Sequence, residues 1–185
     1  MKAGVLALQG DFREHGVVLA DAGASPVEVR TPADLEAVDC LVIPGGESTT
    51  IGKLAQISGL VEPIRERALA GMPVFGTCAG MIALARRVVG GEPLFALMDA
   101  TVRRNAYGRQ VDSFEADIEV EGVDHAVRAV FIRAPIVEET GAEVKVLATH
   151  EGHPVVIEQG ELLAASFHPE LVGESLLHEY FLKKV

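Results

Sequence analysis

The chain has 185 residues, of which 49% are hydrophobic and 5% aromatic, so we expect a single domain over residues 1–185 that folds without disulfides. The formal net charge of −11 argues against nucleic acid as a partner, because phosphates require a basic protein surface. No apolar stretch approaches the ~20 residues of a membrane span, and the first residues do not resemble a signal peptide. The two cysteines make no disulfide framework. We therefore expect a cytoplasmic protein with free thiols and no membrane partner.

The first half of the chain alternates between strand and helix patterns. Short apolar runs predict strands at 3–8, 27–29, 39–43 and 74–75. Helical spacing and helix-ending glycines predict helices at 12–22, from Ser48 or Thr49 as cap to about 57, at 63–70 and at 79–85. Strands that are apolar throughout and alternate with helices predict a parallel sheet covered by helices on both faces, an α/β fold.

After Asn105 the pattern changes to short strands. They are expected at 114–120, 127–132, 144–148, 155–157 and 162–167, with a last helix at about 174–182. Glu151-Gly152 and Gln159-Gly160 suit hairpin turns between the last three strands. We therefore expect the C-terminal half to add antiparallel strands to the parallel sheet.

Residues 76–80 read Gly-Thr-Cys-Ala-Gly and directly follow a short apolar run. This spacing matches the strand-to-helix elbow that holds a nucleophile, with Cys78 in place of serine. Gly76 and Gly80 stand where side chains would clash with a tight turn. The N-terminus of the following helix stabilises a thiolate, which is the nucleophilic form of cysteine. The motif alone equally fits a small buried cysteine, and we expect Cys40 to be one.

A second motif, Ser-Phe-His-Pro-Glu at 166–170, follows the last predicted strand. Catalytic groups gather at strand ends in open α/β sheets, although a lone His-x-Glu is more often an exposed loop. A nucleophilic cysteine needs a base, and the base needs an acceptor that orients it; His168 and Glu170 supply both for Cys78. The other histidines lack metal-ligand spacing and are expected on the surface or in turns, so no metal is predicted; they are His15, His125, His150, His153 and His178.

A third motif, Pro-Gly-Gly-Glu-Ser-Thr at 44–49, also follows an apolar strand. A glycine pair at a strand end can aim backbone amides at an anion or an oxyanion. By itself the segment is more typical of a tight turn and helix cap. It is not a phosphate loop, because the Gly-Lys-Ser/Thr ending is missing.

Together these motifs resemble class I (triad) glutamine amidotransferases. The chain is also similar, over nearly its whole length, to the glutaminase subunits of pyridoxal 5′-phosphate synthase. The similar segments are Leu-Gln-Gly (8–10), Pro-Gly-Gly-Glu-Ser-Thr (44–49), Phe-Gly-Thr-Cys-Ala-Gly (75–80), Arg-Asn-Ala-Tyr-Gly-Arg-Gln-Val-Asp-Ser-Phe-Glu (104–115), Phe-Ile-Arg-Ala-Pro (131–135) and Ser-Phe-His-Pro-Glu (166–170).

The resemblance implies hydrolysis of L-glutamine to L-glutamate and ammonia, without a cofactor, by a Cys78-His168-Glu170 triad. The ammonia then passes to a separate (β/α)8-barrel synthase subunit that makes pyridoxal 5′-phosphate. Backbone amides of Gly46 and Ala79 are expected to meet the oxyanion. The residues that the resemblance places around glutamine are Gly46, Glu47, Ser48, Arg104, Ile132 and Arg133. A guanidinium suits the α-carboxylate of glutamine, and the sequence does not decide between Arg103, Arg109 and these arginines.

Three alternatives remain open at this point. A triad amidotransferase could feed a different synthase, although segment 104–115 disfavours this. A cysteine-elbow hydrolase or stress protein of related fold would use a different set of acid–base residues. A non-catalytic interaction module would have kept the scaffold alone, although the intact Cys-His-Glu set argues against it.

Overall fold

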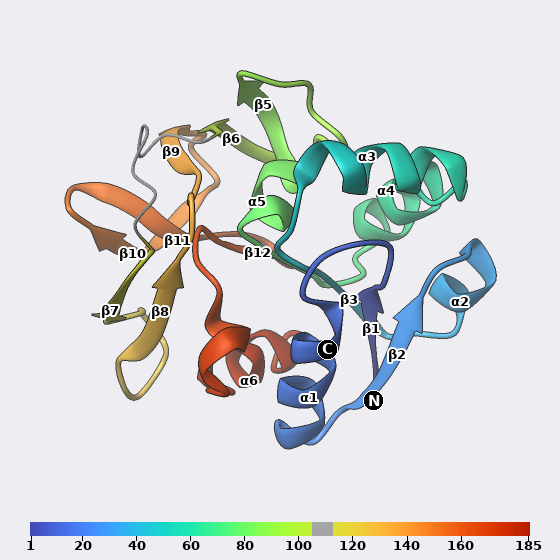
Figure 1. Ribbon diagram of the computed structural model, residues 1–185, viewed down its shortest axis with the longest axis horizontal. Coiled ribbons are helices and arrows are strands. Elements are labelled where there is room, and N and C mark those ends of the chain that lie inside the picture. Colours follow the sequence, from blue (N-terminus) through green and yellow to red (C-terminus); the bar gives the residue numbers. More distant parts are fainter. Residues whose placement is uncertain (105–112) are drawn as a thin grey trace.

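The computed structural model describes residues 1–104 and 113–185, and within them the largest element is a seven-stranded sheet (Figure 1). From one edge to the other, its strands are β10 (Lys145–His150), β11 (His153–Gln159), β12 (Leu162–Ala165), β4 (Val74–Thr77), β3 (Cys40–Ile43), β1 (Lys2–Leu6) and β2 (Ser25–Val29). The five strands from β12 to β2 are mutually parallel. The other two are antiparallel hairpin neighbours, so the expected parallel sheet with added antiparallel strands is confirmed.

The central strands are apolar on both sides because both sides of the sheet are covered. All four residues of β3 are buried. Leu41 and Ile43 belong to one hydrophobic core, whereas Cys40 and Val42 belong to the other. Successive side chains of a strand point to opposite faces, so the continuous apolar pattern indicates a sheet between two cores.

Helices cover each face of this sheet, as predicted (Figure 1). The core on one face receives side chains from α1 (Phe12–Asp21) and α6 (Leu176–Leu182). The core on the opposite face receives them from α2 (Pro32–Glu36), α3 (Ser48–Ile57), α4 (Val61–Leu69) and α5 (Ala79–Leu84). No helix among the described residues is long and apolar enough to cross a membrane.

Two smaller sheets differ from the predicted strand arrangement. β7 (Phe114–Ile118) and β8 (Val127–Phe131) pair with each other and not with the large sheet. Their buried residues pack on the same core as α1 and α6. β5 (Ala85–Val89), β6 (Met98–Arg103) and β9 (Ile136–Thr140) form a three-stranded sheet that the sequence did not predict.

The topology brings four chain segments to one edge of the large sheet. Parallel strands end at the same edge, where ligands bind in open α/β folds. The segments are 7–11 after β1, 44–47 after β3, Cys78 after β4, and 166–168 after β12. The last of them leads into a short 3-10 helix, η1 (Pro169–Val172). The motifs singled out in the sequence therefore meet in space.

Candidate active site

Cys78 occupies a strained turn between β4 and α5. Its φ of 48° and ψ of −101° are values that a residue with a side chain rarely adopts. The side chain is 7% exposed, and the sulfur lies 4.0 Å from the carbonyl oxygen of Ile132. Such strain persists where surrounding structure enforces it, which is the behaviour of a nucleophile elbow.

The two glycines beside Cys78 allow the turn to pack closely. A Cβ on Gly80 would stand 2.1 Å from the carbonyl oxygen of Ile43, and one on Gly76 would stand 2.5 Å from backbone atoms of Gly80. Both contacts are with backbone, so they have no flexible side chain that could move aside. The steric reason predicted for these glycines is therefore confirmed.

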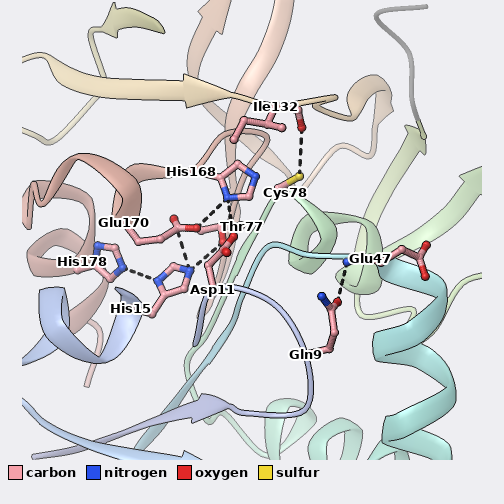
Figure 2. Close-up of polar contacts among 10 residues, drawn as sticks. All are labelled: Gln9, Asp11, His15, Glu47, Thr77, Cys78, Ile132, His168, Glu170 and His178. Carbon is pink, nitrogen blue, oxygen red and sulfur yellow. Dashed lines mark hydrogen bonds and ion pairs between the residues drawn. The ribbon is translucent and has the colours of Figure 1, made fainter. Parts of the chain in front are cut away.

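Figure 2 shows the His168 imidazole beside the Cys78 sulfur, with the Glu170 carboxylate on the far side of the ring. The His168 amide donates to the carbonyl oxygen of Val130 across 2.9 Å, which fixes the backbone at the end of the strand segment. His168 Nδ1 lies 2.8 Å from Glu170 Oε1, and the imidazole lies next to the Cys78 side chain (Figure 2). His168 is 5% exposed and Glu170 is 3% exposed. The structure thus brings together the three residues predicted as a triad.

Burial and hydrogen bonds determine the protonation of His168 and Glu170. Burial disfavours a charge on His168, but hydrogen bonds to Asp11, Cys78 and Glu170 outweigh burial and raise the pKa of the imidazole. Burial raises the pKa of Glu170, while the hydrogen bond and charge of His168 oppose that rise. A positively charged imidazole beside a cysteine stabilises the thiolate.

Asp11 is a site residue that the sequence analysis missed. Its Oδ2 lies 3.3 Å from His168 Nδ1, so the imidazole faces two carboxylates. Asp11, His168 and Glu170 place potential metal-ligand atoms within 4.8 Å of one another, although Nδ1 is already engaged by the 2.8 Å contact with Glu170. Its place in the sequence could have revealed it, because Asp11 follows the end of β1 just as the other site residues follow the ends of their strands.

A cavity of about 410 Å³ opens beside Cys78, within the size range of small-molecule sites. Its lining includes every residue predicted around the substrate and the oxyanion, together with Cys78 and His168 of the predicted triad. The third triad residue, Glu170, is buried and does not line the cavity. The lining residues are Gln9, Asp11, Gly46, Glu47, Ser48, Cys78, Ala79, Ile82, Arg104, Ile132, Arg133 and His168.

Glu47 connects this cavity to α3. Its carboxylate caps the helix by accepting from the amides of Thr49, across 3.1 Å, and Thr50, across 2.7 Å. The hydrogen bond from the Thr50 hydroxyl and those from the two amides lower the pKa of Glu47 to about 2. The predicted cap, Ser48 or Thr49, is therefore wrong, because a carboxylate one residue earlier satisfies two helix amides at once.

The backbone of the 44–47 loop is held by a side chain from the segment that follows β1. The Glu47 amide donates to the side-chain oxygen of Gln9 across 2.7 Å. Gly46 lines the cavity next to this bond, and Ala79, the first residue of α5, lines it beside Cys78. The two residues predicted to supply oxyanion donors thus border the same cavity.

The arginines predicted as candidates for substrate binding differ in their polar contacts. Arg104 lies 3.4 Å from Glu47 Oε1 and 3.2 Å from the Thr49 hydroxyl, whereas Arg103 pairs with Glu138. Arg133 lines the cavity and has a positive φ of 45°, and within residues 1–104 and 113–185 it forms no ion pair. Residues 105–112, which include Arg109 and most of segment 104–115, lie outside the described residues.

Two expectations about buried residues had opposite outcomes. Cys40 is fully buried, as predicted, and burial raises the pKa of its thiol to about 12. His15 and His178 were expected on the surface or in turns, and this is wrong because both are 0% exposed. Each belongs to a helix that packs on the sheet and lies on its buried face, three and four residues before buried apolar side chains. That helical spacing was a signal that the sequence analysis did not use.

A mostly parallel sheet with helices on both faces, and a cysteine on the elbow after a central strand, defines the class I glutamine amidotransferase architecture expected from the motifs. The solved structures agree: a crystal structure of a glutamine amidotransferase superposes with a TM-score of 0.94 at 50% identity, covering 98% of this chain and 97% of that chain.

The sequence relatives have a more specific name than the amidotransferase class. The pyridoxal 5′-phosphate synthase subunit PdxT of Frankia alni is 58% identical over 185 residues, which cover 98% of this chain and 93% of the relative. The protein of the same name from Acidothermus cellulolyticus is 57% identical over 193 residues, which cover 100% of this chain and 93% of that protein. Residues 5–185 match the SNO glutamine amidotransferase family, and the chain belongs to that family.

Proposed function

We propose that this protein hydrolyses L-glutamine to L-glutamate and ammonia as the glutaminase subunit of a pyridoxal 5′-phosphate synthase. The observation that carries the proposal is the convergence of Cys78, His168 and Glu170 beside a cavity of about 410 Å³. The names of the relatives support the choice of synthase.

The proposed chemistry is acyl transfer through a thioester. The Cys78 thiolate attacks the side-chain amide carbon of glutamine, forming a C–S bond. The C–N bond then breaks, and the proton on His168 goes to the departing nitrogen, which leaves as ammonia. His168 next takes a proton from water, whose oxygen attacks the thioester and releases glutamate and the thiolate. Glu170 holds the imidazole in the required tautomer throughout.

The remaining cavity residues are proposed to bind the substrate. The guanidinium of Arg133, which has no ion pair within the described residues, suits the α-carboxylate of glutamine. Arg104, Glu47, Ser48 and Ile132 are proposed to surround the rest of the molecule. Amides of Gly46 and Ala79 are proposed to meet the oxyanion, and removal of one such donor lowers kcat by roughly 10²–10³-fold.

The partner is proposed to be a separate synthase subunit with a (β/α)8 barrel, which uses the ammonia. We propose that residues 1–185 act as one glutamine amidotransferase domain in the cytoplasm, where the free thiols of Cys40 and Cys78 persist. An uncoupled glutaminase wastes glutamine, so we expect low activity alone and higher activity with the synthase. The glycine-containing loop 44–47 is a candidate two-state element for this coupling.

The test is co-purification with the synthase, followed by glutamine-dependent formation of pyridoxal 5′-phosphate. Ammonium salt serves as a control that bypasses the glutaminase. The proposal expects product from either nitrogen source with the wild-type chain. A glutaminase rate that is the same with and without the synthase contradicts coupling. Glutamine hydrolysis without stimulation of this synthase indicates a different synthase, and no hydrolysis indicates a hydrolase of another specificity or an interaction module.

A further inference from the structure

Three polar side chains lie buried behind Glu170. His15 of α1, Thr77 of β4 and His178 of α6 are each 0% exposed. None is among the described residues that line the cavity beside Cys78. Burial of a polar group is unfavourable unless the group is hydrogen-bonded. We therefore expect these three side chains to have polar partners.

Their contacts form a continuous path to the triad (Figure 2). His178 Nε2 lies 2.8 Å from His15 Nδ1. His15 Nε2 lies 3.0 Å from the Thr77 hydroxyl and 3.5 Å from Glu170 Oε2. The other carboxylate oxygen, Oε1, lies 2.8 Å from His168 Nδ1. The path therefore runs from His178 through His15 to the carboxylate that orients His168.

The protons on this path can be assigned. Burial lowers the pKa of His15 well below its usual value and that of His178 to about 3, so each imidazole is neutral and carries one N–H. Within the described residues His178 Nδ1 has no hydrogen-bond partner, and buried N–H groups are left unpaired less often than acceptors. His178 therefore carries its proton on Nε2 and donates it to His15 Nδ1. His15 then carries its own proton on Nε2, facing Thr77 and Glu170.

The His15 N–H faces Glu170 Oε2. Glu170 Oε2 is buried and has no hydrogen bond within residues 1–104 and 113–185. Burial and the nearby charge of Asp11 both disfavour the carboxylate anion, whereas His168 and the backbone amide of Glu170 itself favour it. β8 also packs against η1, but its charged residue, Arg128, is held by Glu115 and Asp117. The N–H of His15 thus adds a favourable dipole to the anion.

We propose that His15, held in this tautomer by His178, is a positioning residue that keeps Glu170 ionised and oriented toward His168. The proposal rests on the proposed glutaminase function. A protonated Glu170 loses the charge that supports the imidazolium formed during catalysis. Glutamine binding does not involve either histidine, so their effect falls on turnover and on its pH dependence.

The experiment compares His15→Leu with His15→Gln in the presence of the synthase, measuring kcat and KM for glutamine against pH. Leucine removes the N–H, so the acid limb of kcat moves up by about one pH unit, and kcat on that limb falls by up to about tenfold. The KM changes less than about twofold. The amide nitrogen of glutamine reaches the place of Nε2, so His15→Gln restores most of the acid limb. His178→Gln and His178→Leu form a second pair with the same expected order.

An unchanged acid limb in His15→Leu, or equal profiles for the leucine and glutamine variants, overturns the proposal. Thermal melting of each variant separates misfolding from lost positioning. The ¹⁵N chemical shifts of the wild-type histidines provide a test that needs no variant: protons on Nε2 of both rings are expected, and a proton on Nδ1 of His15 contradicts the proposal. A wild-type complex without glutamine turnover instead contradicts the proposed function, while the ring-nitrogen shifts still test the path.

Discussion

Gly45 lies directly against the imidazole of His168. A Cβ on Gly45 would stand 2.2 Å from Cε1 and 2.7 Å from Nδ1 of the ring. The loop after β3 therefore packs closely against the proposed general base, so a shift of the loop displaces the imidazole. This contact explains why the first glycine of the Gly-Gly pair has no room for a side chain.

The first prediction tests this contact with Gly45→Ala. The added methyl group displaces the imidazole from Glu170 Oε1, and a displacement of about 1 Å lowers turnover by roughly 100-fold. Steady-state ammonia release measures the effect. Gly16→Ala is the matched control, since its Cβ in α1 would come no closer than 4.0 Å to a neighbouring atom. Equal activity of the two variants contradicts the proposed role of the contact.

The second prediction concerns substrate binding by Arg133. Its guanidinium has no ion pair within the described residues and lines the cavity. A hydrogen bond to a charged group contributes about 1.5–3 kcal/mol, so Arg133→Ala is expected to raise the KM for glutamine roughly 10–100-fold with a smaller change in kcat. Arg103→Ala is the control, because Arg103 pairs with Glu138. A KM unchanged by Arg133→Ala removes Arg133 from the proposed glutamine site.

The third prediction separates the two cysteines. A glutamine-like electrophile is expected to label Cys78, which borders the cavity. Burial raises the pKa of Cys40 to about 12, so this thiol stays protonated and unreactive near pH 7. Peptide mapping by mass spectrometry identifies the labelled residue, and free glutamine is expected to slow the labelling. Labelling of Cys40 at a rate equal to that of Cys78 contradicts the site assignment.

The fourth prediction concerns stability in acid. Burial lowers the pKa of His178 from 6.5 to about 3 in the folded protein, so between these values the unfolded chain binds a proton that the folded chain does not. Stability is therefore lost as the pH falls below 6.5. For one such histidine the loss is about 2 kcal/mol at pH 5. Urea unfolding at pH 7 and pH 5 measures it, and His178→Leu is expected to reduce the difference between the two pH values. A difference that His178→Leu leaves unchanged contradicts this source of acid sensitivity.

The large sheet was predictable because its central strands are continuous apolar runs. β3 and β4 are buried at every residue, and such runs leave little choice of structure. β5 was missed because it contains Arg86 and Arg87, which interrupt the apolar pattern and are exposed. β9 was missed for the same reason, since Glu138 and Glu139 lie within it. Strands of small peripheral sheets bury fewer residues and carry a weaker signal.

The candidate site was predictable where a motif carried its own geometry. Cys78 stands in a spaced glycine motif, and His168 is two residues from Glu170. The buried contacts behind the triad have no such local signal. His15 and His178 are 163 residues apart in the sequence and 2.8 Å apart in the fold. Only the topology, which packs α1 beside α6, brings them together.

The most direct test of the account is ammonia release from glutamine by Cys78→Ala in complex with the synthase. Because the triad acts as a unit, turnover is expected to fall by about 10⁶-fold, to background. His168→Asn is expected to abolish turnover as well, whereas Glu170→Ala retains a fraction. Cys40→Ala, which removes the other thiol, is expected to keep its activity. Turnover retained by Cys78→Ala would contradict the assignment of this residue as the nucleophile.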